Sequence, residues 1–137
     1  AGVTGKVIGI CHSEKSTKRM EELGFCDVVF SADATQPVPV MKKIEELTNG
    51  QMADICINNV NIPDTEMTSI LVTKNTGIVY FFSMATSFTK AALGAEGVGS
   101  DVTMIVGNGY TKGHAEITLQ ELRECEKLRK IFTELYA

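Results

Sequence analysis

The chain has 137 residues, enough for one domain with a buried core, and its 44% hydrophobic and 22% charged residues are typical of soluble globular proteins. A net charge of -4 argues against nucleic-acid binding, which needs concentrated Lys and Arg. No apolar run approaches the roughly 20 residues that span a bilayer, and the first residues lack a signal-peptide pattern. We therefore expect a cytoplasmic protein that binds neither nucleic acid nor membrane.

Short apolar runs alternate with amphipathic segments in the first half of the chain. Ser13 is the expected N-cap of a helix that stops at Gly24, and Asn49 with Gly50 is suited to a left-handed helix end. In chain order, the predicted elements are a strand at 6–11, a helix at 13–23, a strand at 27–30 and a helix at 37–47.

The second half repeats this alternation, and its last amphipathic stripe predicts one continuous helix. In chain order, the predicted elements are a strand at 53–58, a helix at 63–72, a strand at 77–82, a helix at 87–93, a strand at 101–106 and a helix at 115–136. Apolar strands separated by helices predict an α/β fold with a parallel sheet covered on both faces. No linker interrupts the pattern, so residues 1–137 are expected to form a single domain.

The cysteines give no sign of a metal or redox centre. They are widely spaced and contain no CxxC pair, so we predict neither a zinc site nor a redox motif. Cys26, Cys56 and Cys125 lie in or beside apolar runs and are expected to pack as small hydrophobes. Cys11 differs because it ends a predicted strand.

Ligands of open parallel sheets bind outside the carboxyl ends of the strands. Four short stretches occupy such positions, and Asn58, Asn59 and Asn61 supply amides that both donate and accept hydrogen bonds. Any one of these stretches is equally explained as a polar turn, whereas together they favour a binding site. The four stretches are residues 11–13, 58–61, 82–84 and 107–110.

A dinucleotide site needs a glycine-rich turn between its first strand and first helix. No GxGxxG occurs, and the glycines of 94–99 follow a helix instead of a strand. We expect the first strand, glycine loop and first helix to lie upstream of residue 1. In the strand order 3-2-1-4-5-6 the first strand is central. A chain without it is expected to fold poorly, to pair its flanking strands directly, or to borrow a strand, and to bind cofactor weakly on its own.

Several segments resemble the medium-chain dehydrogenase superfamily. Residues 6–10 and 18–29 resemble its second βαβ unit, and residues 44–57 its passage from helix to fourth strand. Residues 81–88 and 106–115 resemble amino-acid dehydrogenases of lysine fermentation. The resemblance implies a partial Rossmann-like, doubly wound sheet, NAD or NADP as cofactor, oxidative deamination of a small amino-acid substrate, and a homodimer.

The resemblance also implies positions for the cofactor. In the superfamily an acidic residue usually holds the adenosine ribose at the position where this chain has Cys11. Without that carboxylate, a 2′-phosphate on the ribose would not be repelled. Lys15 or His12 could then attract the 2′-phosphate. Without an Arg there, NAD stays possible, and we expect weak discrimination. Catalytic groups are expected from a separate N-terminal domain. The implied contacts are Cys11, His12, Ser13 and Lys15 at the adenosine ribose, Asn59 and Asn61 at the adenine, Phe82 and Ser83 at the nicotinamide ribose, and Gly107, Asn108 and Gly109 near the nicotinamide ring.

Other functions stay open on the sequence alone. The chain also fits another medium-chain-type dehydrogenase or reductase, a nucleotide-sensing α/β module without catalysis, or a structural domain that keeps the fold without a ligand. A substrate domain beside a glycine loop would favour an enzyme. A glycine loop joined to a transporter or DNA-binding segment would favour a sensor.

Overall fold

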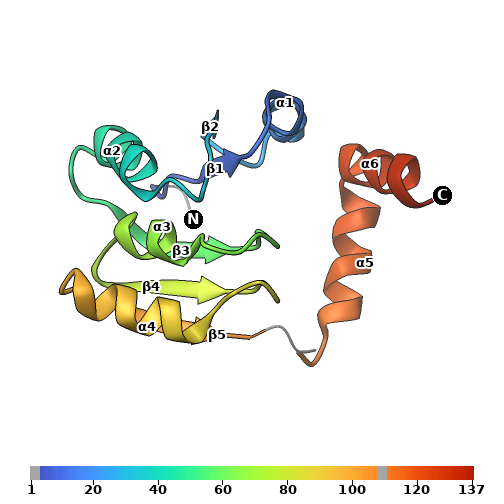
Figure 1. The fold of residues 1–137 in the computed structure, drawn as a ribbon. Helices are drawn as coiled ribbons and strands as arrows, with labels where there is room; N and C mark the ends of the chain where they lie inside the picture. Colours follow the sequence, from blue (N-terminus) through green and yellow to red (C-terminus); the bar gives the residue numbers. More distant parts are fainter. Residues whose placement is uncertain (1–3, 108–110) are drawn as a thin grey trace. The chain divides into compact units, whose positions relative to one another are not determined.

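The computed structural model of the chain describes residues 4–107 and 111–137. These residues form helices alternating with parallel strands (Figure 1), which confirms the predicted α/β class. The chain divides into two compact units, Ala1–Ser31 with Gly109–Ala137 (the first unit) and Ala32–Asn108 (the second unit). Within the described ranges, no helix has both the length and the apolar character needed to cross a membrane.

The first unit contains a pair of parallel strands in which Ile8 lies opposite Val28. Asp27 fixes this pairing, because its carboxylate accepts a hydrogen bond from Val7 N at 2.6 Å while its own N–H donates to Val7 O at 2.9 Å. The elements of this unit are β1 (Ile8–Cys11), α1 (Glu14–Leu23), β2 (Val28–Ser31), α5 (His114–Glu124) and α6 (Glu126–Tyr136).

Both ends of α1 follow the sequence prediction. Ser13 caps the helix, its hydroxyl accepting from Ser16 N at 3.3 Å, while the Ser16 hydroxyl accepts from Ser13 N at 3.2 Å. Gly24 ends the helix with φ 75°, a left-handed conformation that glycine adopts without strain.

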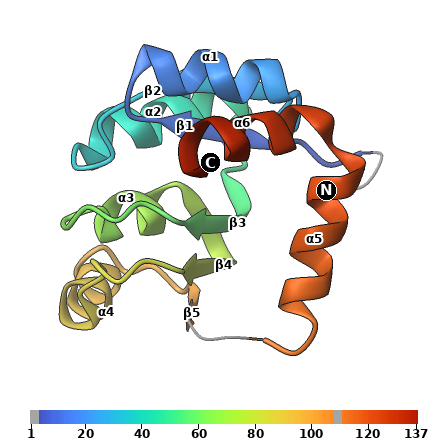
Figure 2. The same cartoon turned by 90° about the vertical axis from the view of Figure 1, so that its right-hand side faces the viewer.

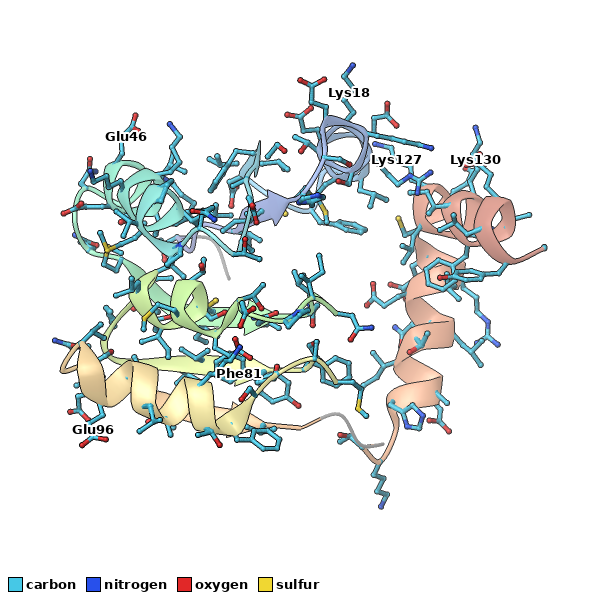
Figure 3. The ribbon with its side chains drawn as sticks, in the orientation of Figure 1. Lys18, Glu46, Phe81, Glu96, Lys127 and Lys130 are labelled. Atoms are coloured by element: carbon cyan, nitrogen blue, oxygen red, sulfur yellow. The ribbon has the colours of Figure 1, made fainter. Side chains whose placement is uncertain are left out.

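The prediction of one continuous closing helix is wrong, because the chain breaks between α5 and α6. Cys125 has an extended backbone (φ -106°, ψ 99°), and its sulfur accepts from Leu128 N at the start of α6. The Arg129 guanidinium donates to the carbonyls of Leu122 and Arg123, which have no helical partner at the end of α5. In Figure 3 Lys127 reaches from α6 toward α1, where its Nζ donates to a carbonyl at 2.6 Å.

The second unit contains a three-stranded parallel sheet in the order β3-β4-β5. Figure 2 shows α3 and α4 on the same side of this sheet. The described residues thus form two parallel sheets, β1-β2 in the first unit and β3-β4-β5 in the second. The elements of this unit are α2 (Pro37–Leu47), β3 (Ala53–Asn58), α3 (Glu66–Leu71), β4 (Thr73–Phe81), α4 (Phe88–Gly97) and β5 (Thr103–Val106).

One hydrophobic cluster in the core of the second unit lies between its sheet and α4. Val79 and Phe81 of β4 are fully buried against Ala91 of α4, and Figure 3 shows Phe81 between the two elements. On the opposite face of β3, Ile55 and Ile57 are 59% and 61% exposed. Among the described residues, helices of this unit therefore cover one face of β3.

Two helices of this unit differ from their predicted bounds for local reasons. α3 begins at Glu66 and not at Pro63, because Asp64 has a left-handed φ of 69° that interrupts helical geometry. α4 continues past its predicted end and includes Gly94. A Cβ at Gly94 would lie 3.1 Å from Met67 Cε, so the glycine permits close packing of α3 against α4.

The buried aromatic ring of Phe81 gives the first test. We expect Phe81→Ala to lower the free energy of unfolding by about 3–5 kcal/mol, because the substitution leaves a cavity against α4. The exposed Phe88 on α4 supplies a matched control, and Phe88→Ala should change the free energy by about 0.5 kcal/mol or less. Urea denaturation measures both, and equal losses in the two variants would contradict this assignment of the core.

Candidate site at the carboxyl edge of the sheet

The strand register brings the ends of β3, β4 and β5 level with one another. Asn58 lies opposite Phe81, which lies opposite Val106. The next residues continue the ladder, since Phe82 N donates to Asn58 O at 2.9 Å and Gly107 N donates to Phe81 O at 3.2 Å. The loops that follow these three strands therefore start side by side at the carboxyl edge, where ligands of open parallel sheets bind.

Asn58 holds the first of these loops in place. The buried amide Nδ2 donates to Thr65 Oγ1 and to Ser69 Oγ, each at 2.9 Å, and the Oδ1 accepts from Val60 N at 3.0 Å. Both amide protons and the carbonyl are thus used inside the protein. Asn58 is structural, while the next residue, Asn59, is exposed.

The loop after β4 presents apolar side chains to solvent. Phe82 is 47% exposed and Met84 is 80% exposed. The Phe82 ring stacks on the Tyr80 ring, with centroids 6.0 Å apart and planes 22° apart. Ser83 is half-buried, and its hydroxyl accepts from Ala85 N at 3.1 Å, which shapes the turn. A flat apolar surface beside hydroxyl and amide groups is suited to a ring ligand.

Gly107 supplies backbone without a side chain at the end of β5. A Cβ at this position would lie 2.9 Å from the Tyr80 hydroxyl and 3.6 Å from Tyr80 Cζ. The glycine therefore leaves room for the phenol, which reaches across from β4. Asn108 and Gly109, the other predicted contacts of this loop, lie outside the described residues.

The remaining predicted contacts belong to the first unit. Cys11 is half-buried at the end of β1, and His12 and Lys15 are exposed. Ser13 is exposed, but its hydroxyl already caps α1. The structure thus brings together Asn59, Asn61, Phe82, Ser83 and Gly107 in one unit, and Cys11, His12, Ser13 and Lys15 in the other.

Two cysteine thiols have a raised pKa, which supports a packing role. Burial raises the pKa of the Cys56 thiol, although hydrogen bonds with Ser69 and Thr73 partly oppose this. The pKa of Cys26 is raised by burial first, and then by the charges of Cys11 and Asp27. Such thiols are poor nucleophiles at neutral pH. Within residues 4–107 and 111–137, no three His, Cys, Asp or Glu side chains lie close enough to hold a metal ion.

Tyr80 and Glu66 contribute to the carboxyl edge of the sheet, but no motif or periodicity in the sequence points to them. In the sequence, Tyr80 is an ordinary aromatic residue of a predicted strand. Its contribution to this edge depends on the close approach of Gly107, which is distant in the chain. The sequence suggests an exposed helical residue at Glu66, yet Glu66 is buried and its Oε1 accepts a hydrogen bond from Ser87 N at 2.6 Å.

Comparisons with known proteins agree with this geometry. Residues 1–96 match a family described as zinc-binding dehydrogenase. The chain is 58% identical to L-erythro-3,5-diaminohexanoate dehydrogenase of Acetoanaerobium sticklandii over 135 residues, or 98% of the chain. Over the same length it is 53% identical to the enzyme of that name from Fusobacterium nucleatum subsp. nucleatum. The chain spans 39% of the length of these curated relatives.

Two solved structures share the fold over 87% of the chain. One is a mycobacterial protein complexed with NADPH, with a TM-score of 0.59, 15% identity and 39% of that protein covered. The other is a quinone oxidoreductase of Pseudomonas syringae pv. Tomato DC3000, with a TM-score of 0.57, 20% identity and 38% covered. At these identities the likeness shows the fold alone.

The contact between Gly107 and Tyr80 gives a double-variant test. We expect Gly107→Ala to cost about 1–3 kcal/mol of stability, because the new methyl group overlaps the phenol oxygen. Adding Tyr80→Phe removes that oxygen and leaves the ring carbon at an ordinary contact distance of 3.6 Å. The double variant should recover most of the loss in thermal or urea denaturation, whereas simple additivity of the two substitutions would refute the contact.

Proposed function

Because this chain belongs to the zinc-binding dehydrogenase family, we propose that it is the nucleotide-binding part of an NAD(P)-dependent L-erythro-3,5-diaminohexanoate dehydrogenase. The observation that carries the proposal is 58% and 53% identity to two such enzymes along nearly the whole chain. The reaction converts the 3-amino substrate, water and NAD(P)⁺ into 5-amino-3-oxohexanoate, ammonium, NAD(P)H and a proton. This chain spans 39% of those relatives, so we assign the catalytic groups to the remainder of the full-length enzyme.

The carboxyl edge of the second unit fits the nicotinamide half of a dinucleotide. When bound, the cofactor supplies the hydride acceptor. We assign Phe82 and Ser83 to the nicotinamide ribose and Gly107, with Asn108 and Gly109, to the ring. The side-chain-free backbone at Gly107 and the exposed aromatic face of Phe82 support this assignment. Asn59 and Asn61 are exposed amides that we assign to the adenine side.

The end of β1 is our candidate for the adenosine ribose. We assign Cys11, His12, Ser13 and Lys15 to it. No carboxylate stands at these four positions to repel a 2′-phosphate, and the exposed ammonium of Lys15 would attract one in NADP. Both cofactors are therefore candidates. Because zinc needs three or four clustered ligands, which the described residues do not form, we assign zinc no step here.

We further propose that the two units belong to one partial Rossmann-like dinucleotide-binding domain of a cytoplasmic enzyme of lysine fermentation that acts as a homodimer. The resemblance to medium-chain dehydrogenases supports the domain and the dimer. The net charge of -4 supports a protein that does not bind nucleic acid.

Titration of NAD and NADP into the protein at its full encoded length tests the function. We expect both cofactors to bind with affinities within about a hundredfold of each other, or ~2.7 kcal/mol. Diaminohexanoate should then drive formation of reduced nicotinamide, seen by its absorbance. Binding of neither cofactor would refute the proposal, and binding without turnover would favour a nucleotide sensor.

Lys15→Ala refines this experiment. It should weaken NADP binding about tenfold and leave NAD binding unchanged, because only NADP carries the 2′-phosphate. Lys42→Ala, on the exposed side of α2, removes the same charge elsewhere and should change neither affinity. Equal changes in NADP affinity in the two variants would contradict the assignment of Lys15 to the cofactor site.

A further inference from the structure

Glu66, the first residue of α3, is a buried carboxylate that the cofactor contacts proposed above do not use. Its side chain is 3% exposed, and its Oε1 accepts a hydrogen bond from Ser87 N at 2.6 Å. Ser87 is the N-cap of α4, where its hydroxyl accepts from Lys90 N. The carboxylate of Glu66 therefore ties the start of α3 to the start of α4.

Burying a carboxylate is costly unless charge and hydrogen bonding compensate it. The N-terminus of α4 offers partial positive charge and a backbone donor. Lys90, one turn into α4, adds a full positive charge. Its pKa is raised mainly by its hydrogen bond and charge interaction with Asp64, and to a smaller extent by Glu66. The backbone at the N-terminus of α4 thus meets the carboxylate of Glu66, while the ammonium of Lys90 is paired with Asp64.

The loop between β4 and α4 is consequently anchored at both ends. At its start, Phe82 N donates to Asn58 O, and at its end Ser87 N donates to Glu66. Between them, Thr86 N donates to Ser83 O at 3.3 Å. At the α4 end of the loop, Glu66 is an anchor that belongs to α3, and therefore to neither the loop nor its flanking elements β4 and α4.

We infer that Glu66 is a positioning residue for the dinucleotide, holding the loop of residues 82–87 so that Phe82 and Ser83 face the nicotinamide ribose. This inference rests on the proposed function. It predicts that the hydrogen-bond acceptor at position 66 sets cofactor affinity, although Glu66 itself does not touch the cofactor.

The test compares variants of the protein at its full encoded length by cofactor titration and by hydrogen exchange of the Ser87 amide. Glu66→Ala should raise the cofactor Kd about tenfold and speed exchange at Ser87, because the loop loses its anchor. Glu66→Gln keeps an oxygen acceptor at the same reach and should restore both values. If Glu66→Ala does not fold, Glu66→Asp replaces it, since the shorter side chain should weaken the same anchor and raise Kd.

Thr68→Val is the matched control on the same helix. Thr68 is buried and its hydroxyl donates to Ala34 O at 2.6 Å, away from the loop. This substitution should lower the melting temperature and leave the cofactor Kd unchanged, which separates positioning from general destabilisation of α3.

The outcomes distinguish this inference from the proposed function. If the unaltered protein binds neither NAD nor NADP, the proposed function fails and the inference falls with it. If the unaltered protein binds cofactor, and Glu66→Ala binds equally well despite faster exchange at Ser87, the inference is overturned while the function stands. A Glu66→Gln variant as weak as Glu66→Ala would also overturn it, because the acceptor is retained.

Discussion

The parallel register of β3, β4 and β5 is the constraint on which the candidate site depends. It places Asn58, Phe81 and Val106 level with one another, so that the three following loops start from the same edge. The same register assigns Val79 and Phe81 to the buried face under α4. Because side chains alternate along a strand, a slip by one residue would expose this core and turn the loops away together. Packing of the core and placement of the three loops are therefore specified by one set of backbone hydrogen bonds.

The short helix α3 transmits that constraint to the loops through buried polar groups. Thr65 and Ser69 accept from the amide of Asn58, and Glu66 accepts from Ser87 N. Every buried side-chain nitrogen or oxygen in the part of the chain that the structure describes has a hydrogen-bond partner. A fully satisfied polar network fixes a unique arrangement, whereas an apolar contact would allow sliding. This explains polar residues where a simple α/β core would use Val or Leu.

Local signals predicted much of this structure from the sequence, and contacts between distant residues account for the remainder. Pro37 and Asn49 with Gly50 bound α2 as expected, and the apolar run of β3 ends at Asn58 as predicted. The break at Cys125 has no such signal, because the apolar stripe runs through it without Gly or Pro. Strand ends predicted Phe82 and Gly107 as candidate site residues, whereas Glu66 becomes significant only through its hydrogen bond with Ser87, a contact that no periodicity in the sequence encodes.

The polar anchors and the exposed apolar side chains at this edge depend on each other. A loop that must present Phe82 and Met84 to solvent gains nothing from its own burial, so without other contacts those side chains would favour folding back onto the sheet. Hydrogen bonds at both loop ends, from Phe82 N to Asn58 O and from Ser87 N to Glu66, oppose that collapse. A ligand at this candidate site would then meet a loop that is already ordered, and less conformational entropy would be lost on binding. In this arrangement the cost of removing polar groups from water falls on buried groups such as Glu66, and the apolar side chains of Phe82 and Met84 stay exposed at the candidate site.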